Sequence, residues 1–113
     1  MKTPYYLYDL KLLEKTLQEL VFESNNYLIH YAIKANTDER INNIIASYGL
    51  GADCVSGNEI KHALNCGFKP EKIVFAGVGK SDDEIEIGLL NGIACFNVES
   101  IQEIQVINSI ANR

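Results

Sequence analysis

Lys34 is the residue of this chain whose type and setting point most directly to covalent chemistry. It follows the apolar run Tyr31-Ala32-Ile33, and the alternation of side chains along a strand would put it on the same side as Ala32. If that side is shielded from water, desolvation disfavours the ammonium form and leaves a neutral amine, which attacks aldehydes. A lysine that merely reaches solvent at the end of a strand is the alternative, and the spacing alone does not exclude it.

Two carboxylates could approach the same region as Lys34. Asp53 lies within the short apolar stretch Ala52 to Val55, where a carboxylate needs a partner. Glu59 follows Ser56 by three residues, a spacing that also forms a capping box at the start of a helix without any ligand. Functional groups of parallel α/β proteins gather at the carboxyl ends of strands. We therefore expect a functional role for Asp53 and leave Glu59 open between ligand and cap.

Two other patterns are incomplete as functional motifs. Residues 77–81 resemble the end of a nucleotide-binding loop, but the full pattern requires a glycine where this chain has Val74. We therefore interpret Lys80 as a residue near a helix start and Ser81 as its cap. His30 and His62 have no other ligand at metal-binding spacing, so no metal site is expected.

The pattern of the whole chain is a repeated unit: a short apolar run, a cap signal, a helical stretch and a glycine or asparagine stop. Strands are predicted at 27–33, 52–55, 72–76 and 93–98. Helices are predicted after the cap signals Asp9, residues 36–39, Ser56, Ser81 and Ser100, and each of the three serines begins a Ser-x-x-Glu capping box. Alternating strands and helices favour parallel pairing with right-handed crossovers. An extended segment and a helix from Leu10 to Phe22 precede these four units, so we divide the chain into residues 1–26 and a partial barrel domain, 27–113.

Two α/β architectures fit four such units, the first half of a (β/α)8 barrel and a small doubly wound sheet. The last predicted strand, 93–98, would be an unprotected edge if the sheet ended there, which soluble proteins avoid. The final helix reaches Arg113 without a glycine stop or a following strand. We therefore expect the amino-terminal half of a barrel, truncated at its carboxyl end.

Composition narrows the possible partners and compartments. Of the 113 residues, 47% are hydrophobic, and ten basic against fifteen acidic side chains give a net charge of -5 without any basic run, so we expect no nucleic-acid partner. The chain has neither a secretory signal nor an apolar stretch of roughly 20 residues. We expect a cytoplasmic protein without membrane contact, whose cysteines, Cys54, Cys66 and Cys95, are reduced.

Five blocks of the chain carry a resemblance to a known family. The segment Tyr31-Ala32-Ile33-Lys34-Ala35-Asn36 resembles the Y-A-[VI]-K-A-N signature of the barrel-type decarboxylases that depend on pyridoxal phosphate. Residues 51–60 resemble the G-x-D-x-x-S-x-x-E-[LI] block of the diaminopimelate decarboxylase branch. Residues 3–9, 73–81 and 96–100 resemble further blocks in the same order, so the resemblance covers almost the whole chain.

The resemblance implies an eight-stranded barrel with a second, mostly β domain, acting as a homodimer. It implies that Lys34 carries pyridoxal phosphate, with Ala32, Asp53 and Glu59 close to the cofactor. The implied reaction is the loss of carbon dioxide from an amino-acid substrate, meso-2,6-diaminopimelate, to give L-lysine. Other cofactor and substrate residues would lie beyond Arg113, so the chain alone is expected to be inactive.

Three alternatives stay open. Ornithine and arginine decarboxylases share the signature. They stay open because the residues that would recognise the distal end of the substrate are not in this chain. Alanine racemases share the cofactor lysine but usually continue with A-Y-G-H-G, where this chain has Thr37-Asp38-Glu39-Arg40. A non-catalytic, doubly wound binding module is a reading of a different class.

Overall fold

The computed structural model describes residues 2–113, and residue 1 of the predicted segment 1–26 lies outside that range. The first helix, α1 (Leu10–Glu23), begins where the sequence predicted it. The Asp9 carboxylate accepts the backbone N–H of Leu12 at 3.0 Å and so satisfies one of the free donors of the first turn. The helix ends where the Ser24 N–H bonds to the Leu20 carbonyl.

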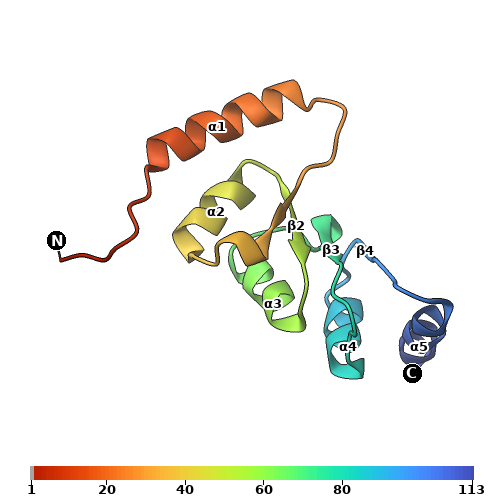
Figure 1. Ribbon diagram of the computed structural model, residues 1–113. Helices are drawn as coiled ribbons and strands as arrows, with labels where there is room; N and C mark the ends of the chain where they lie inside the picture. The colour runs from red at the N-terminus through yellow and green to blue at the C-terminus, as the bar shows by residue number, and fades with distance from the viewer. Residues whose placement is uncertain (1) are drawn as a thin grey trace.

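Four parallel strands form one sheet, and their order in space is their order in the chain. The strands are β1 (His30–Ala32), β2 (Gly51–Cys54), β3 (Ile73–Phe75) and β4 (Cys95–Phe96). The α-helices that follow them are α2 (Glu39–Ser47), α3 (Gly57–Asn65), α4 (Asp82–Leu90) and α5 (Ile101–Ala111), and single 3-10 turns occupy η1 (Ile33–Ala35) and η2 (Pro70–Lys72). Figure 1 shows this succession from α1 at one end to α5 at the other. A doubly wound sheet reverses its strand order at a switch point, so the sequential order fits part of a barrel and not that alternative.

The outer strands are shorter than the sequence predicted. Apolar residues continue on both sides of β1, but the ladder with β2 extends only from His30 to Ala32. The chain then turns, because the Asn36 N–H bonds back to the Ile33 carbonyl at 3.2 Å. At the other edge, β4 pairs over only two residues instead of the predicted 93–98. The apolar runs predicted where the strands lie. The length of each outer strand is set by how many of its residues pair with the neighbouring strand.

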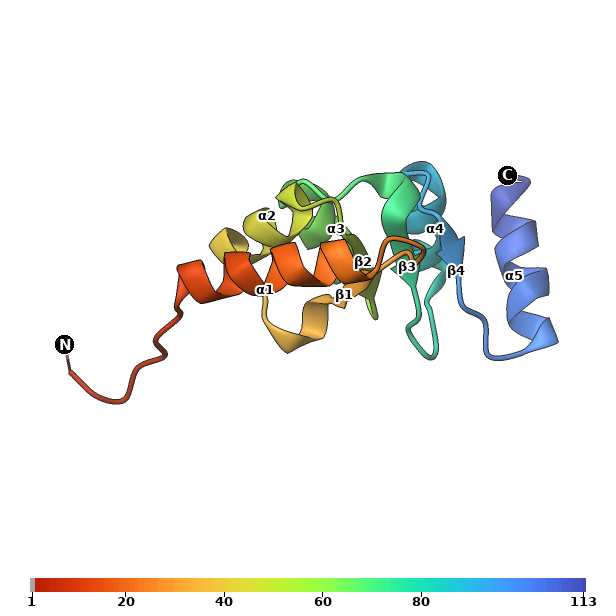
Figure 2. The ribbon, with the colours of Figure 1, turned by 90° about the horizontal axis from the view of Figure 1, so that it is seen from above.

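The two faces of the sheet differ in what covers them. Side chains at alternate positions on β2 and β3 are almost fully buried at 0–1% exposure, namely Ala52, Cys54, Ile73 and Phe75. They pack against apolar residues of the following helices, and Figure 2 shows α2, α3 and α4 along one side of the strands. The opposite face carries Ala32, Asp53, Val74 and Cys95, which the register aligns in one row across the sheet. We call this row the uncovered face.

Of the three predicted capping boxes, one forms completely and two form only in part. Ser81 and Glu84 form the full reciprocal box, and Glu84 also accepts the Gly57 N–H at 2.9 Å, which joins the starts of α3 and α4. Ser56 and Ser100 each cap their helix as expected. Their glutamate partners do not close the box, however, because each carboxylate accepts an N–H one residue before the cap instead.

Candidate functional site

Lys34 lies at the carboxyl end of β1, but not within the strand. It is the middle residue of η1, so the two-residue alternation that placed it beside Ala32 does not apply. Its neighbour Ile33 is fully buried in the core, whereas the Lys34 side chain is exposed. Of the two possibilities left open by the spacing, these residues show the lysine that reaches solvent at a strand end, and the cofactor role of Lys34 stays a prediction. The turn therefore exposes the Lys34 amine to solvent, while the buried Ile33 side chain anchors the turn in the core.

Asp53 and Ala32 are adjacent partners on neighbouring strands of the uncovered face. Asp53 is partly buried, yet its carboxylate accepts no hydrogen bond from any described residue between 2 and 113. It therefore remains free to hold a cationic or hydrogen-bond-donating group. The structure thus brings together two of the predicted site residues, with Lys34 two residues along the chain from Ala32.

Glu59 is also at this end of the sheet but already has a structural task. Its Oε2 atom accepts the Val55 N–H at 2.8 Å, which holds the loop between β2 and α3. Its charge is close enough to affect a neighbouring thiol: burial, together with the Glu59 and Asp53 carboxylates, raises the pKa of Cys54 to about 12. The predicted capping box does not close, because Glu59 accepts the Val55 N–H and not that of Ser56, and the cofactor role of Glu59 stays a prediction.

A buried polar bridge beneath the Lys34 turn was missed by sequence reasoning. The Asn42 side chain on α2 has 0% exposure, and its Nδ2 atom donates to the Asn36 carbonyl at 3.1 Å. The same atom lies 3.0 Å from Nε2 of His62 on α3. The available signal was an asparagine between Ile41 and Ile45 on the apolar side of a predicted helix, where a polar group requires partners.

Lys80 is a second functional-looking residue whose role only the structure reveals. Its side chain has 0% exposure, and its ammonium donates to the Asn97 carbonyl at 2.6 Å and pairs with Glu103 Oε1 at 2.7 Å. It also lies 5.3 Å from the centre of the Phe75 ring. All of these partners belong to the chain itself. The lysine of the incomplete nucleotide loop therefore joins α5 to the loop before α4 and is not free to bind a phosphate.

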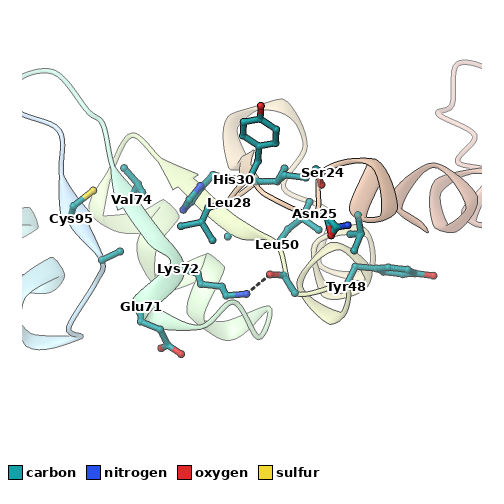
Figure 3. Close-up of a pocket in the computed structure, with 16 residues that line it drawn as sticks. Ser24, Asn25, Leu28, His30, Tyr48, Leu50, Glu71, Lys72, Val74 and Cys95 are labelled. Carbon is teal, nitrogen blue, oxygen red and sulfur yellow. Dashed lines mark hydrogen bonds between the residues drawn. The ribbon is translucent and has the colours of Figure 1, made fainter. Parts of the chain in front are cut away.

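A cavity of about 420 Å³ opens at the other end of the strands. Figure 3 shows His30, Val74 and Cys95 from the uncovered face beside residues that precede β2 and β3, including Lys72, whose ammonium donates to the Gly49 carbonyl at 2.7 Å. Because parallel barrels use the carboxyl ends of their strands for catalysis, this cavity is at the wrong end to serve Lys34. Within residues 2–113, no group of three metal-ligating side chains occurs and no helix is long and apolar enough to span a membrane.

The carboxyl ends of β1 and β2 therefore offer an accessible primary amine and a free carboxylate on a parallel α/β scaffold. An exposed amine that bonds to no described side chain fits capture of an aldehyde, and a carboxylate nearby fits a cationic group on the same ligand. These are features of barrel enzymes that hold an aldehyde cofactor on a lysine. Comparison with known proteins specifies the class further.

Residues 10–113 match the family described as pyridoxal-dependent decarboxylase, pyridoxal binding domain, and the chain belongs to that family. Diaminopimelate decarboxylase from Bacteroides thetaiotaomicron is 53% identical over 114 residues, covering 98% of this chain and 30% of the relative. The enzyme of the same name from Helicobacter pylori strain J99 is 47% identical over 112 residues. The chain thus spans under a third of the length of these curated relatives.

Solved structures support the same fold. The crystal structure of diaminopimelate decarboxylase from Helicobacter pylori complexed with L-lysine matches with a TM-score of 0.91 at 45% identity, over 99% of this chain and 29% of that one. The arginine decarboxylase of Paramecium bursaria Chlorella virus matches with a TM-score of 0.81 at 26% identity, over 88% of this chain and 27% of that one. The open four-stranded sheet corresponds to the amino-terminal barrel region of such decarboxylases.

Proposed function

We propose that the complete protein encoded by this gene removes carbon dioxide from meso-2,6-diaminopimelate to give L-lysine, with pyridoxal phosphate held on Lys34. The observation that carries the proposal is the 53% identity to a diaminopimelate decarboxylase across 98% of the chain. The geometry supports it, because the amine and the Asp53 carboxylate occupy the carboxyl ends of adjacent strands. Decarboxylation requires more groups than this chain contains, so the 113 residues alone are expected to be inactive.

The residues of the chain have separable tasks in this proposal. Lys34 would supply the amine nitrogen that holds the cofactor aldehyde, and its exposed position leaves that nitrogen accessible as a nucleophile. Asp53 supplies a negative charge at the adjacent strand end, suited to attract and orient a cationic group. Ala32 has a small side chain between them on the uncovered face and leaves room for a flat ring. Glu59 keeps the loop after β2 in place and can lend a second negative charge.

Pyridoxal phosphate, when bound, supplies the electron sink that makes loss of a carboxyl group from an α-carbon feasible. The protein decides which bond to that carbon breaks by how it orients the substrate. In this chain, Ala32, Asp53 and Val74 lie in one row across the strands, and Ala32 is two residues from Lys34. We therefore assign to the uncovered face the task of seating the cofactor and excluding water from one side.

The substrate is the finer part of the proposal. The arginine decarboxylase shares the fold but only 26% of the aligned residues, whereas the lysine-complexed diaminopimelate decarboxylase shares 45%. This difference favours diaminopimelate over arginine or ornithine. Assaying carbon dioxide release from the three amino acids with the complete protein tests this preference, and faster turnover of ornithine or arginine would reject it.

Replacing Lys34 by alanine tests the cofactor assignment. The complete protein with Lys34→Ala should lose the absorption band of lysine-bound cofactor, because no amine remains to form the bond, and its decarboxylation rate should fall by at least about a thousandfold. Lys11→Ala provides the matched control, since Lys11 is an exposed lysine on α1, and should behave as wild type. Retention of both the band and the activity in the Lys34 variant would refute the assignment.

We also propose that the complete protein works in the cytoplasm as a homodimer with active sites at the subunit interface, as the family resemblance implies. Light scattering after size-exclusion chromatography measures the oligomeric state directly. A monomer that is fully active at assay concentration would reject the dimer.

A further inference from the structure

We infer that Asn42 and His62 are positioning residues that hold the Lys34 turn in place through a buried amide–imidazole bridge. The inference rests on the proposed function, because the position of Lys34 matters only if that residue carries the cofactor. Neither side chain would touch the cofactor. Both would act through the backbone that aims the lysine.

Two contacts hold the Lys34 turn: the buried side chain of Ile33 and the hydrogen bond from Asn42 to the Asn36 carbonyl. Ile33 is fully buried and secures the start of η1, and the Asn36 N–H closes the turn on the Ile33 carbonyl at 3.2 Å. The Asn36 carbonyl faces inward and accepts the Asn42 Nδ2 donor at 3.1 Å. Lys34 itself is exposed and makes no hydrogen bond or ion pair with residues 2–113. The backbone turn therefore determines where its amine lies.

Hydrogen-bond chemistry defines the direction of the bridge. A backbone carbonyl can only accept, so the atom of Asn42 that faces Asn36 must be the amide nitrogen. The second hydrogen of that nitrogen then points to His62 Nε2 at 3.0 Å, which must act as an acceptor. This contact corresponds to the tautomer of His62 that has its proton on Nδ1. The Cys66 Sγ atom also lies 3.5 Å from this Nε2 atom.

Stability alone does not explain an asparagine at this position. The Oδ1 atom of Asn42 is buried and has no partner among residues 2–113, and such an orphaned acceptor carries a desolvation cost. An apolar residue of similar size on this buried side of α2 would avoid that cost, but it would leave the Asn36 carbonyl without its Asn42 donor. What only an amide offers here is two donors, one for the turn and one for α3. The bridge therefore links η1, α2 and α3 into one rigid support.

The test compares four variants of the complete protein: Asn42→Leu, His62→Leu, His62→Gln and the control Asn43→Leu. Asn43 is an exposed asparagine next to Asn42 on the same helix. The measured quantities are the rate at which the absorption band of lysine-bound cofactor appears after mixing with pyridoxal phosphate, the cofactor dissociation constant, and the melting temperature.

We expect Asn42→Leu and His62→Leu to slow band formation by about tenfold or more, since a misplaced reacting group loses orientation. His62→Gln should restore a near-normal rate, because a glutamine carbonyl can accept the same N–H. Asn43→Leu should match wild type. The His62 pair decides the question if Asn42→Leu does not fold.

Two results would overturn the inference for different reasons. If the Leu variants melt at lower temperature but form the band at the wild-type rate with unchanged affinity, the bridge is only structural. If the wild-type band survives in Lys34→Ala, the proposed function fails and the positioning role fails with it. The first result leaves the cofactor assignment of Lys34 untouched.

Discussion

Ile33 and Lys34 are neighbours in the turn η1, but Ile33 anchors the turn in the core and Lys34 carries the predicted reactive amine. Ile33 has 0% exposure and commits its side chain to the core, while Lys34 projects outward from the next position. Neighbouring side chains also diverge in a 3-10 turn, which has three residues per turn, so Ile33 and Lys34 point in different directions. This arrangement anchors a reactive group without burying it.

The three thiols should differ sharply in reactivity. Burial raises the pKa of Cys54 to about 12 and also raises that of Cys66, whereas Cys95 is exposed on the outer strand. Thiolate is the reactive form, so near pH 8 the first two thiols should alkylate slowly in the chain as described. Timed iodoacetamide labelling with peptide mass mapping should find Cys95 modified first. Equal labelling of Cys54 under native conditions would contradict this.

Asp38 should make the start of α2 sensitive to acid. Its carboxylate caps the helix and pairs with the Arg40 guanidinium at 2.7 Å, which lowers its pKa from 3.8 to about 2. Because the pKa is lower in the folded state, the stabilisation is complete above about pH 4 and is lost as pH falls toward 2. Urea unfolding of wild type and Asp38→Asn between pH 6 and pH 3 measures this.

Asparagine retains the cap but does not titrate, so it isolates the charge. The stability advantage of wild type over Asp38→Asn should shrink steadily below about pH 4. A difference that stays constant, or grows, as the pH falls would contradict the assigned role of the ion pair.

At the scale of elements, α5 packs against α4 and is also attached to the loop before α4 by a buried ion pair. Several apolar residues of α5 remain exposed, including Ile101 and Ile104. The Lys80 ammonium reaches across from the loop before α4 to Glu103 and the Asn97 carbonyl. Glu103 also accepts the Glu99 N–H, and these contacts lower the pKa of its carboxyl.

Replacing Lys80 by methionine should therefore destabilise the fold substantially. Removing one partner leaves the other largely buried and uncompensated, which costs about 2 to 4 kcal/mol. Lys15→Met is the matched control, because the Lys15–Glu19 pair at 3.8 Å is mostly exposed and should contribute less than about 0.5 kcal/mol. Chemical denaturation of the two variants of the complete protein gives both free energies of unfolding. Equal losses would argue against a special role for Lys80.

At the scale of the molecule, one face of the sheet is packed and the other is not. Helices bury the side that carries Ala52, Cys54, Ile73 and Phe75, whereas the row from Ala32 to Cys95 is open. The linker before β1 is also bare, with Tyr27 78% and Leu28 83% exposed. The chain measures 50 × 39 × 22 Å along its principal axes, so much of its apolar surface is accessible to partners.

The 113 residues on their own should consequently behave poorly in solution. Exposed apolar surface and a two-residue edge strand favour association between copies. We expect the isolated chain to aggregate, or to bind a hydrophobic dye and melt without a sharp transition, while the complete protein melts cooperatively. Size-exclusion chromatography and calorimetry at matched concentrations distinguish the cases. A soluble monomer with one cooperative transition would overturn this prediction.

Local patterns in the sequence were sufficient to determine the type and order of the elements. Asp9, Ser56, Ser81 and Ser100 all cap the helices predicted from them, because caps and periodicity act within a few residues. The motif around Lys34 was sufficient to predict the family, which the comparison confirms. The strand-end position of Lys34 and Asp53 follows from the same local order.

Only the tertiary structure decided which polar groups meet. The strand order that excluded a doubly wound sheet, the Asn42–His62 bridge and the Lys80–Glu103 pair all depend on contacts between segments far apart in the chain. The partner of a buried polar group is a property of such contacts, and periodicity does not identify that partner. The reason is physical: a side chain's neighbours along the chain determine its element, whereas its neighbours in space determine its charge, its partners and its task.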